Sequence, residues 1–283
     1  MPRPVSRGMR AFLYVAVALT FFAGTQLSIL SEHADKYFAW DIAVPMTAVF
    51  IGASFWAASV LLLWASRQRE WVRARVPVPA VFVVATMLMV ATVEHIEQFD
   101  SILGFVWIEV YAVVPPIAVV LAVQQLSVPG TDAPATEPLP GWLRLTLGLE
   151  ALAMLAIGIT LYAAPDALDQ AWPWGLTPLT SKAVGTWLAG IATIAGYVAL
   201  RNDRADMTGA ALSYIVLGAL LLLGVARFPD DIDFSLVGSW VFVAFAASSL
   251  AIGLYAARLG LREGRYAPVL APGGVPVEVK DRR

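Results

Sequence analysis

The two histidines are the only imidazole groups in the chain, and both stand among carboxylates. His33 lies in the stretch SEHADKY and His95 in VEHIEQFD. Imidazole and carboxylate together suit a metal site if the two segments meet in the fold. Two histidines on facing helices also suit bis-imidazole haem ligation. The competing interpretation is that both are hydrated histidines at a polar boundary.

A second candidate site combines Glu94, His95, Glu97 and Asp100 with Arg227, which stands 133 positions after Glu94. The chain carries a sequence repeat with that offset, described below, so Glu94 and Arg227 occupy equivalent positions. We therefore predict an ion pair between them that joins the two repeats. Charges at membrane depth pair with each other or line a water-filled cavity, so an ion or small-molecule site is the alternative.

Three more charged residues fall within apolar segments. Lys182 is placed in a first helical turn, where the helix dipole disfavours a cation. It is expected either to hold an anionic group or to extend its ammonium to the interface. Glu109 and Glu150 are intramembrane acids of the kind found on proton or cation pathways. The pair Pro115-Pro116 removes backbone donors close to Glu109, and carbonyls freed in this way could line the same site.

The composition identifies an integral membrane protein. Hydrophobic residues make up 59% of the 283, charged residues only 14%, and the mean hydropathy is +0.73. Soluble proteins carry about a quarter charged residues. The absence of cysteine excludes disulfides, thiolate metal sites and cysteine nucleophiles. The sequence has no phosphate-binding glycine loop, and its arginines are spread over many loops, so we expect no nucleic-acid partner.

Eight segments are long enough to cross a bilayer core, which needs about 20 apolar residues. They cover approximately 11–30, 43–65, 78–98, 104–126, 143–164, 182–200, 208–228 and 235–257. Of the 19 lysines and arginines, only Lys36, Lys182 and Arg227 fall on the side opposite the N-terminus. Because Lys and Arg accumulate on the cytoplasmic side, both termini are predicted to be cytoplasmic.

The spans form two sets of four. The stretch 38–56 is echoed at 172–189, and the repeated features are Trp40, Pro45 and Gly52 in the first copy and Trp172, Trp174, Pro178 and Gly185 in the second. Four spans per copy give both copies the same orientation, related by a pseudo-two-fold axis along the membrane normal. We predict an N-terminal repeat at 1–126, a Pro-rich cytoplasmic linker at 127–141, a C-terminal repeat at 142–258 and a disordered cytoplasmic tail at 259–283.

The repeated stretches also carry a resemblance. The pattern F-A-W-x-I…P-x-T-A…G-A begins at Phe38, and W-P-W-x-L-T-P-L-T begins at Trp172. Both are similar to motifs of uncharacterised bacterial multi-pass membrane proteins. That resemblance implies an eight-span fold in a bacterial plasma (inner) membrane and no particular activity.

The aromatic residues have two interpretations. The chain contains 10 tryptophans and 8 tyrosines. Trp40, Trp107, Trp172 and Trp174 are expected in an interfacial belt on the outer side, where Trp is enriched. Alternatively, they line a mouth for a quinone, a pigment or a quaternary amine.

Three functions remain open from the sequence. The first is a transporter-like protein with a small-molecule or ion site near the outer face. The second is an oxidoreductase-type protein that binds a metal, haem, quinone or pigment. The third is a structural or assembly partner in a membrane complex. The lipid bilayer is the one partner that all three require, and the oligomeric state is open.

Overall fold

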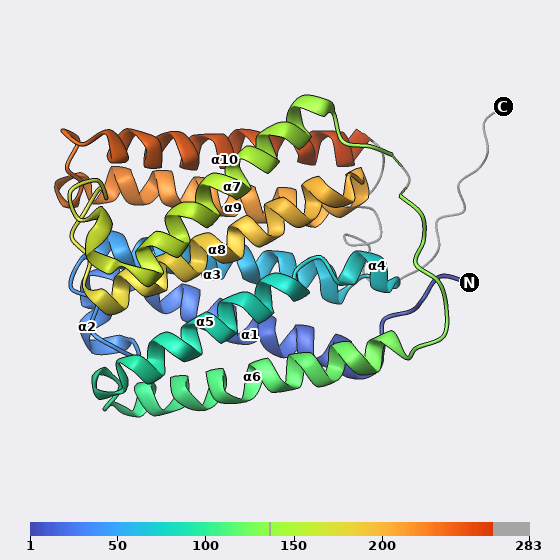
Figure 1. The fold of residues 1–283 in the computed structure, drawn as a ribbon, viewed down its shortest axis with the longest axis horizontal. Coiled ribbons are helices and arrows are strands. Elements are labelled where there is room, and N and C mark those ends of the chain that lie inside the picture. Colours follow the sequence, from blue (N-terminus) through green and yellow to red (C-terminus); the bar gives the residue numbers. More distant parts are fainter. Residues whose placement is uncertain (136, 263–283) are drawn as a thin grey trace.

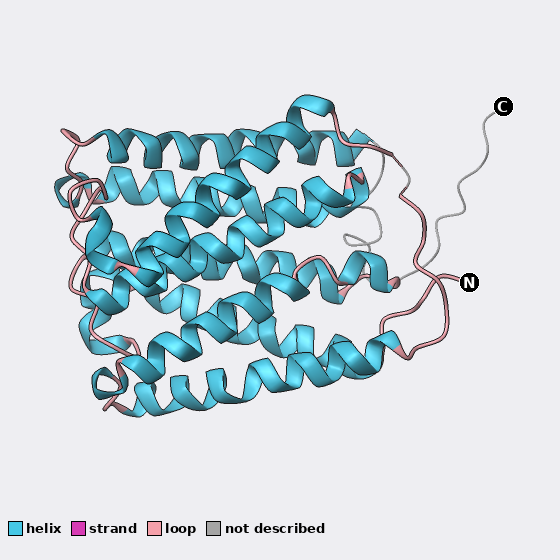
Figure 2. Ribbon diagram, viewed as in Figure 1, coloured by secondary structure: helices cyan, strands magenta, loops and turns pink. Residues whose placement is uncertain are grey.

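The computed structural model describes residues 1–135 and 137–262, and every regular element in those ranges is a helix (Figures 1 and 2). Eight helices are long and apolar enough to cross a membrane, which confirms the predicted all-α, eight-span class. They are α1 (Arg7–Ile29), α3 (Pro45–Ser66), α5 (Val78–Glu94), α6 (Ile102–Leu126), α7 (Gly141–Ala163), α8 (Pro178–Arg201), α9 (Arg204–Arg227) and α10 (Val237–Arg262). Two short helices, α2 (Ala34–Tyr37) and α4 (Trp71–Ala74), precede α3 and α5.

Local sequence explains where the two central spans begin. Pro45 and Pro178 occupy the first turns of α3 and α8, where a missing N–H leaves no helical hydrogen bond unmade. At α8 a capping box adds to this, because the Thr177 hydroxyl accepts from the Thr180 N–H at 3.2 Å and the Thr180 hydroxyl accepts from the Thr177 N–H at 2.8 Å. The repeated Pro-x-Thr pattern therefore marks two helix starts.

Helices α3 and α8 are the most buried spans, while α6 and α1 are the least buried. Helix α3 packs against α1 and α9, and α8 packs against α7 and α5 (Figure 1). At the edges, α6 packs on α5 and α10 packs on α9. Each of these contacts has its counterpart in the other half of the chain, as a two-fold relation would produce. The duplication itself stays a prediction.

The repeated glycines explain two of the close helix pairs. A Cβ added to Gly52 of α3 would lie 2.9 Å from the backbone nitrogen of Ser28 in α1. A Cβ added to Gly185 of α8 would meet the backbone oxygen of Gly158 in α7. Neither position leaves room for a side chain, so glycine permits the backbones to approach, as it does at many membrane helix contacts.

The segment between α6 and α7 is tied to several elements at the N-terminal end of the bundle, the end where α1 starts. The Arg3 N–H donates to the Thr131 carbonyl at 3.0 Å, and the Arg204 N–H donates to the Glu137 carbonyl at 2.9 Å. Helix α10 extends to Arg262, past the predicted boundary at 258, and residues 263–283 lie outside the described residues. The predicted tail therefore starts too early.

The expected tryptophan belt is wrong for three of its four members. Trp40, Trp107 and Trp174 are buried in the protein core, and Trp172 is half-buried. The Trp40 and Trp107 ring centroids lie 4.9 Å apart, and the Trp174 indole N–H donates to the Thr47 hydroxyl at 2.8 Å. These rings pack segments of the chain together and do not face lipid.

Candidate functional site

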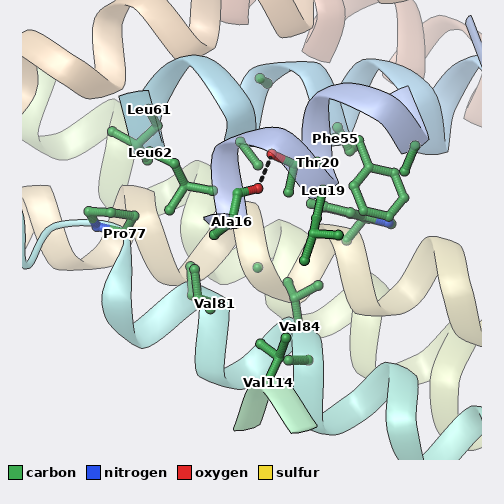
Figure 3. Close-up of a pocket in the computed structure, with 18 of the residues that line it drawn as sticks. Ala16, Leu19, Thr20, Phe55, Leu61, Leu62, Pro77, Val81, Val84 and Val114 are labelled. Carbon is green, nitrogen blue, oxygen red and sulfur yellow. Dashed lines mark hydrogen bonds between the residues drawn. The ribbon is translucent and has the colours of Figure 1, made fainter. Parts of the chain in front are cut away.

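A cavity of about 260 Å³ lies between helices of the bundle (Figure 3). Its walls come from α1, α3, α5 and α6 of the first half and from α8 and α9 of the second. Labelled in the close-up are Ala16, Leu19, Thr20, Phe55, Leu61, Leu62, Pro77, Val81, Val84 and Val114. The lining is almost entirely apolar, so the space suits an apolar molecule.

One wall of the cavity is aromatic. The Phe55 ring of α3 lies 4.5 Å from the Trp187 ring of α8, measured between centroids. Trp107 of α6 packs at 4.3 Å on Tyr111, and its indole N–H donates to the Thr92 hydroxyl at 3.0 Å. Such edge and tilted contacts stabilise pairs of rings by about 0.5–1.5 kcal/mol beyond burial. This wall is therefore held in place by contacts among its own rings.

Two polar atoms in this lining have no partner in the described structure. The Tyr214 hydroxyl and the Trp187 indole nitrogen are buried and make no hydrogen bond. Two other hydroxyls of the lining are hydrogen-bonded, since Thr20 donates to the Ala16 carbonyl and Ser54 to the Phe50 carbonyl, both at 2.8 Å. Buried donors are nearly always hydrogen-bonded, so these two donors are free to pair with an acceptor placed in the cavity.

The cavity opens sideways. Among its lining residues, Phe22 of α1 is 68% exposed and Val106 of α6 is 55% exposed. Both face outward from apolar stretches that lipid would cover in a membrane. The space is therefore accessible from the bilayer between α1 and α6, which are the least buried spans.

The predicted ion pair between Glu94 and Arg227 is wrong. Glu94 instead pairs with Lys182 of α8, with 3.0 Å between Oε2 and Nζ. Arg227 pairs with Glu32, with 2.9 Å between Nη2 and Oε1. Equivalent positions in two repeats need not meet, because only residues beside a two-fold axis contact their counterparts. Each of these charges finds an opposite charge on a neighbouring element instead.

Lys182 is fully engaged within the chain. Besides pairing with Glu94, its ammonium donates to the Tyr162 carbonyl at 3.0 Å and lies 4.7 Å from the centre of the Tyr162 ring. Carboxylate, carbonyl and aromatic face together offset the unfavourable position near a helix N-terminus. These contacts make Lys182 a link between α5, α7 and α8.

The histidines are not gathered into a metal site. In the described part of the chain, no three residues of the types His, Cys, Asp and Glu lie close enough together to hold a metal ion. The His95 ring nitrogen Nδ1 lies 3.1 Å from the Ala91 carbonyl, and His33 is exposed. Haem ligation by the two histidines stays a prediction, and no contact in the structure favours it.

The remaining predicted site residues are dispersed. Glu97 and Asp100 are exposed in the loop between α5 and α6. Helix α6 continues without a break through Pro115 and Pro116, so the carbonyls that lose their donors to these prolines lie within a continuous helix. Glu109 lies on the outside of α6, away from the aromatic wall. Its assignment to a proton or cation pathway stays a prediction.

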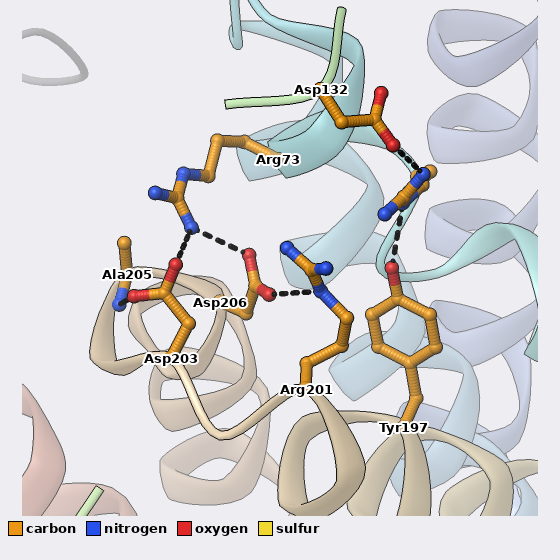
Figure 4. Close-up of polar contacts among 8 residues, drawn as sticks. Arg73, Asp132, Tyr197, Arg201, Asp203, Ala205 and Asp206 are labelled. Carbon is orange, nitrogen blue, oxygen red and sulfur yellow. Dashed lines mark hydrogen bonds and ion pairs between the residues drawn. The ribbon is translucent and has the colours of Figure 1, made fainter. Parts of the chain in front are cut away.

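An ion-pair network at the N-terminal end was missed (Figure 4). Arg73 contacts Asp203 at 2.7 Å and Asp206 at 2.8 Å, and Arg201 contacts Asp206 at 3.2 Å. Both aspartates are fully buried. The arginines had been interpreted only as markers of topology. The signal that could have revealed the network is a pair of acids close together in sequence on the arginine-rich side, one of them at the N-cap of α9.

A polar contact inside the bundle was also missed. The Ser248 hydroxyl of α10 donates to Glu150 Oε1 of α7 at 2.7 Å, while Glu150 Oε2 is buried without a partner. This hydrogen bond joins two helices that make few other contacts. It places Glu150 against a helix neighbour rather than on a continuous relay with Glu109.

Comparisons with known proteins give no assignment: no family model, no curated protein and no solved structure matches this chain. The resemblance in the two aromatic motifs stays a prediction. Function must therefore be argued from the geometry of the chain itself.

Proposed function

We propose that this protein binds a largely apolar molecule with a carbonyl-type acceptor, such as a quinone, in its central cavity. The observation that carries the proposal is the pair of buried donors without partners, Tyr214 Oη and Trp187 Nε1, in an otherwise apolar lining. Leaving a buried donor unpaired costs about 1–3 kcal/mol, so a ligand acceptor that pairs with either donor gains binding free energy. The remaining binding free energy comes from burial of the ligand's apolar surface against the cavity walls.

The opening between α1 and α6 supports entry of the ligand from the bilayer. An apolar ligand is concentrated in lipid, and the exposed lining residues Phe22 and Val106 lie on that path. This supports a ligand of the membrane phase over a water-soluble one.

Transport of the same ligand is a second candidate function. The cavity is walled by helices from both halves of the chain, so a shift of one half against the other would change its exposure. The distribution of lysine and arginine supports cytoplasmic termini, and the motif resemblance supports a bacterial plasma membrane.

Binding can be tested with a decyl-substituted benzoquinone as the probe. The protein in lipid nanodiscs should show saturable quenching of tryptophan fluorescence, after subtraction of a nanodisc blank. Tyr214→Phe removes the donor, keeps the ring, and should weaken affinity about fivefold, the equivalent of one neutral hydrogen bond. Tyr37→Phe, at an exposed tyrosine outside the cavity, is the matched control. Quenching that does not saturate, or an affinity that is unchanged both in Tyr214→Phe and in Trp187→Phe, would contradict the proposal.

A further inference from the structure

Glu109 is an acid on a lipid-facing surface. It is exposed on α6, seven residues after Ile102, which places it about 10 Å along the helix. Phe105 and Val113, one turn to either side on the same face, are 61% and 47% exposed. Apolar residues that face outward on both sides show that the hydrocarbon region extends past Glu109. Its carboxyl therefore lies at membrane depth and not at the headgroup boundary.

No other residue of the described chain pairs with this carboxyl. No hydrogen bond or ion pair to Glu109 is present, in contrast to Glu94 and Glu150, which both have partners. Acids inside membranes are rare, and they usually pair or mark the path of a ligand or ion. A cation from outside the chain would therefore stabilise the unpaired carboxylate of Glu109.

Glu109 also borders an apolar groove of about 300 Å³ between α1 and α6. Phe12 and Val15 of α1 and Ile117 of α6 are among its walls. Glu109 is the only charged residue among them, and its side-chain carbons face the groove while its carboxyl group lies at the groove edge. Four lining residues, Ala16, Leu19, Val110 and Val114, also line the central cavity. The groove is therefore continuous with the opening through which the cavity meets the bilayer.

From these observations we infer that Glu109 selects lipophilic cations at the entrance of the central cavity. The carboxylate pairs with the positive charge while the groove and cavity hold the apolar body. This inference rests on the proposed function, because it needs the cavity as the place where the apolar part is bound. A second copy of this chain does not offer the complementary charge, since its described Lys and Arg residues within the spans lie near helix ends. A helix from a partner protein would need a contact surface along most of its length to bind stably. The groove spans only about two turns of α1, which is too short for that.

The test compares a lipophilic cation with an uncharged analogue of the same shape. Tetraphenylphosphonium and tetraphenylmethane are suitable probes, measured on protein in neutral-lipid nanodiscs against a nanodisc blank. The intact protein should bind the cation about tenfold more tightly than the neutral analogue, because attraction between opposite charges is strong in a medium of low dielectric constant. Glu109→Gln should abolish this preference and leave binding of the neutral analogue unchanged. Glu97→Gln, at an exposed acid in a loop, is the control and should retain the preference.

The two proposals fail in different ways. If the intact protein prefers neither probe, or if Glu109→Gln keeps the preference for the cation, the role of Glu109 is overturned. If the decyl benzoquinone binds normally in that case, the central cavity remains a binding site without charge selection. If neither the quinone nor the neutral analogue binds saturably, the cavity proposal and the inference that rests on it both fail.

Discussion

Arg73 and Asp206 form an ion pair of 2.8 Å, and they are separated by 133 positions in the sequence. The same offset relates Pro45 to Pro178 at the starts of the two central spans. A residue can contact its own counterpart in a duplicated fold only beside the axis that relates the copies. An axis along the membrane normal, as predicted, would therefore pass beside this pair, which Figure 4 shows.

We expect this network to stabilise the bundle strongly. Asp206 is fully buried and accepts from both Arg73 and Arg201, so Asp206→Asn would leave two guanidinium groups partly unpaired. Removing one partner from a buried pair costs about 3–5 kcal/mol. The measurement is unfolding of the purified protein by denaturant in detergent. Glu32→Gln breaks the exposed pair with Arg227 and should cost no more than about 1 kcal/mol. Equal effects of the two substitutions would contradict this account.

The close contact between α7 and α8 depends on Gly185. A valine there would meet the backbone of Gly158, so the helices would have to separate and lose their packing. Gly185→Val should lower the unfolding midpoint and the yield of folded protein. A useful comparison is Gly148→Ala in α7, where an added Cβ meets nothing within 4 Å. Gly148→Ala should leave the unfolding midpoint unchanged or raise it slightly. An equal fall in the unfolding midpoint of both variants would show that the contact between Gly185 and Gly158 does not determine stability.

The Trp174 indole is predicted to contribute through its hydrogen bond as well as its packing. It donates to the Thr47 hydroxyl at 2.8 Å, and both residues are buried. Trp174→Phe should cost at least about 1 kcal/mol, partly because Thr47 loses its donor. Thr47→Val removes the other partner, and a double-mutant cycle isolates the pair. A coupling energy of zero in that cycle would mean that only the ring packing matters.

The loop before α10 should respond to acid. Hydrogen bonds donated by the Ser235 hydroxyl at 2.6 Å and its N–H at 2.9 Å lower the pKa of the Asp233 carboxyl below its usual value of 3.8. A lowered pKa stabilises the fold above the unfolded-state pKa, and that contribution is lost as the pH falls through the folded-state pKa. Protease sensitivity of the loop should therefore be constant from neutral pH down to about pH 4 and rise below it. In Asp233→Asn the loop should be more sensitive at neutral pH and show no such rise.

Hydropathy predicted the spans well because lipid imposes a minimum length on any apolar helix. All eight helices appear where the sequence placed them, with differences of a few residues at the ends set by features such as the Thr177 capping box. Pro45 and Pro178 begin two of these helices, whose predicted starts were 43 and 182. These are local properties, and a sequence contains them directly.

The candidate site was predicted poorly because it depends on which helices are neighbours. Glu94 pairs with Lys182 only because α5 packs on α8, and that contact has no local signal. Trp187 and Tyr214 look like ordinary core aromatics in the sequence, and only the packing leaves their polar atoms without partners. Trp40 and Trp174 matched an interfacial position by distance from the helix ends, yet the folded loops bury them.

The most direct test of the cavity proposal is a structure of the protein in lipid nanodiscs saturated with the decyl benzoquinone. The account predicts ligand density in the central cavity, with a quinone oxygen within hydrogen-bond distance of Tyr214 Oη or Trp187 Nε1. A cavity filled by the protein's own side chains, with both donors paired inside the chain, would contradict it.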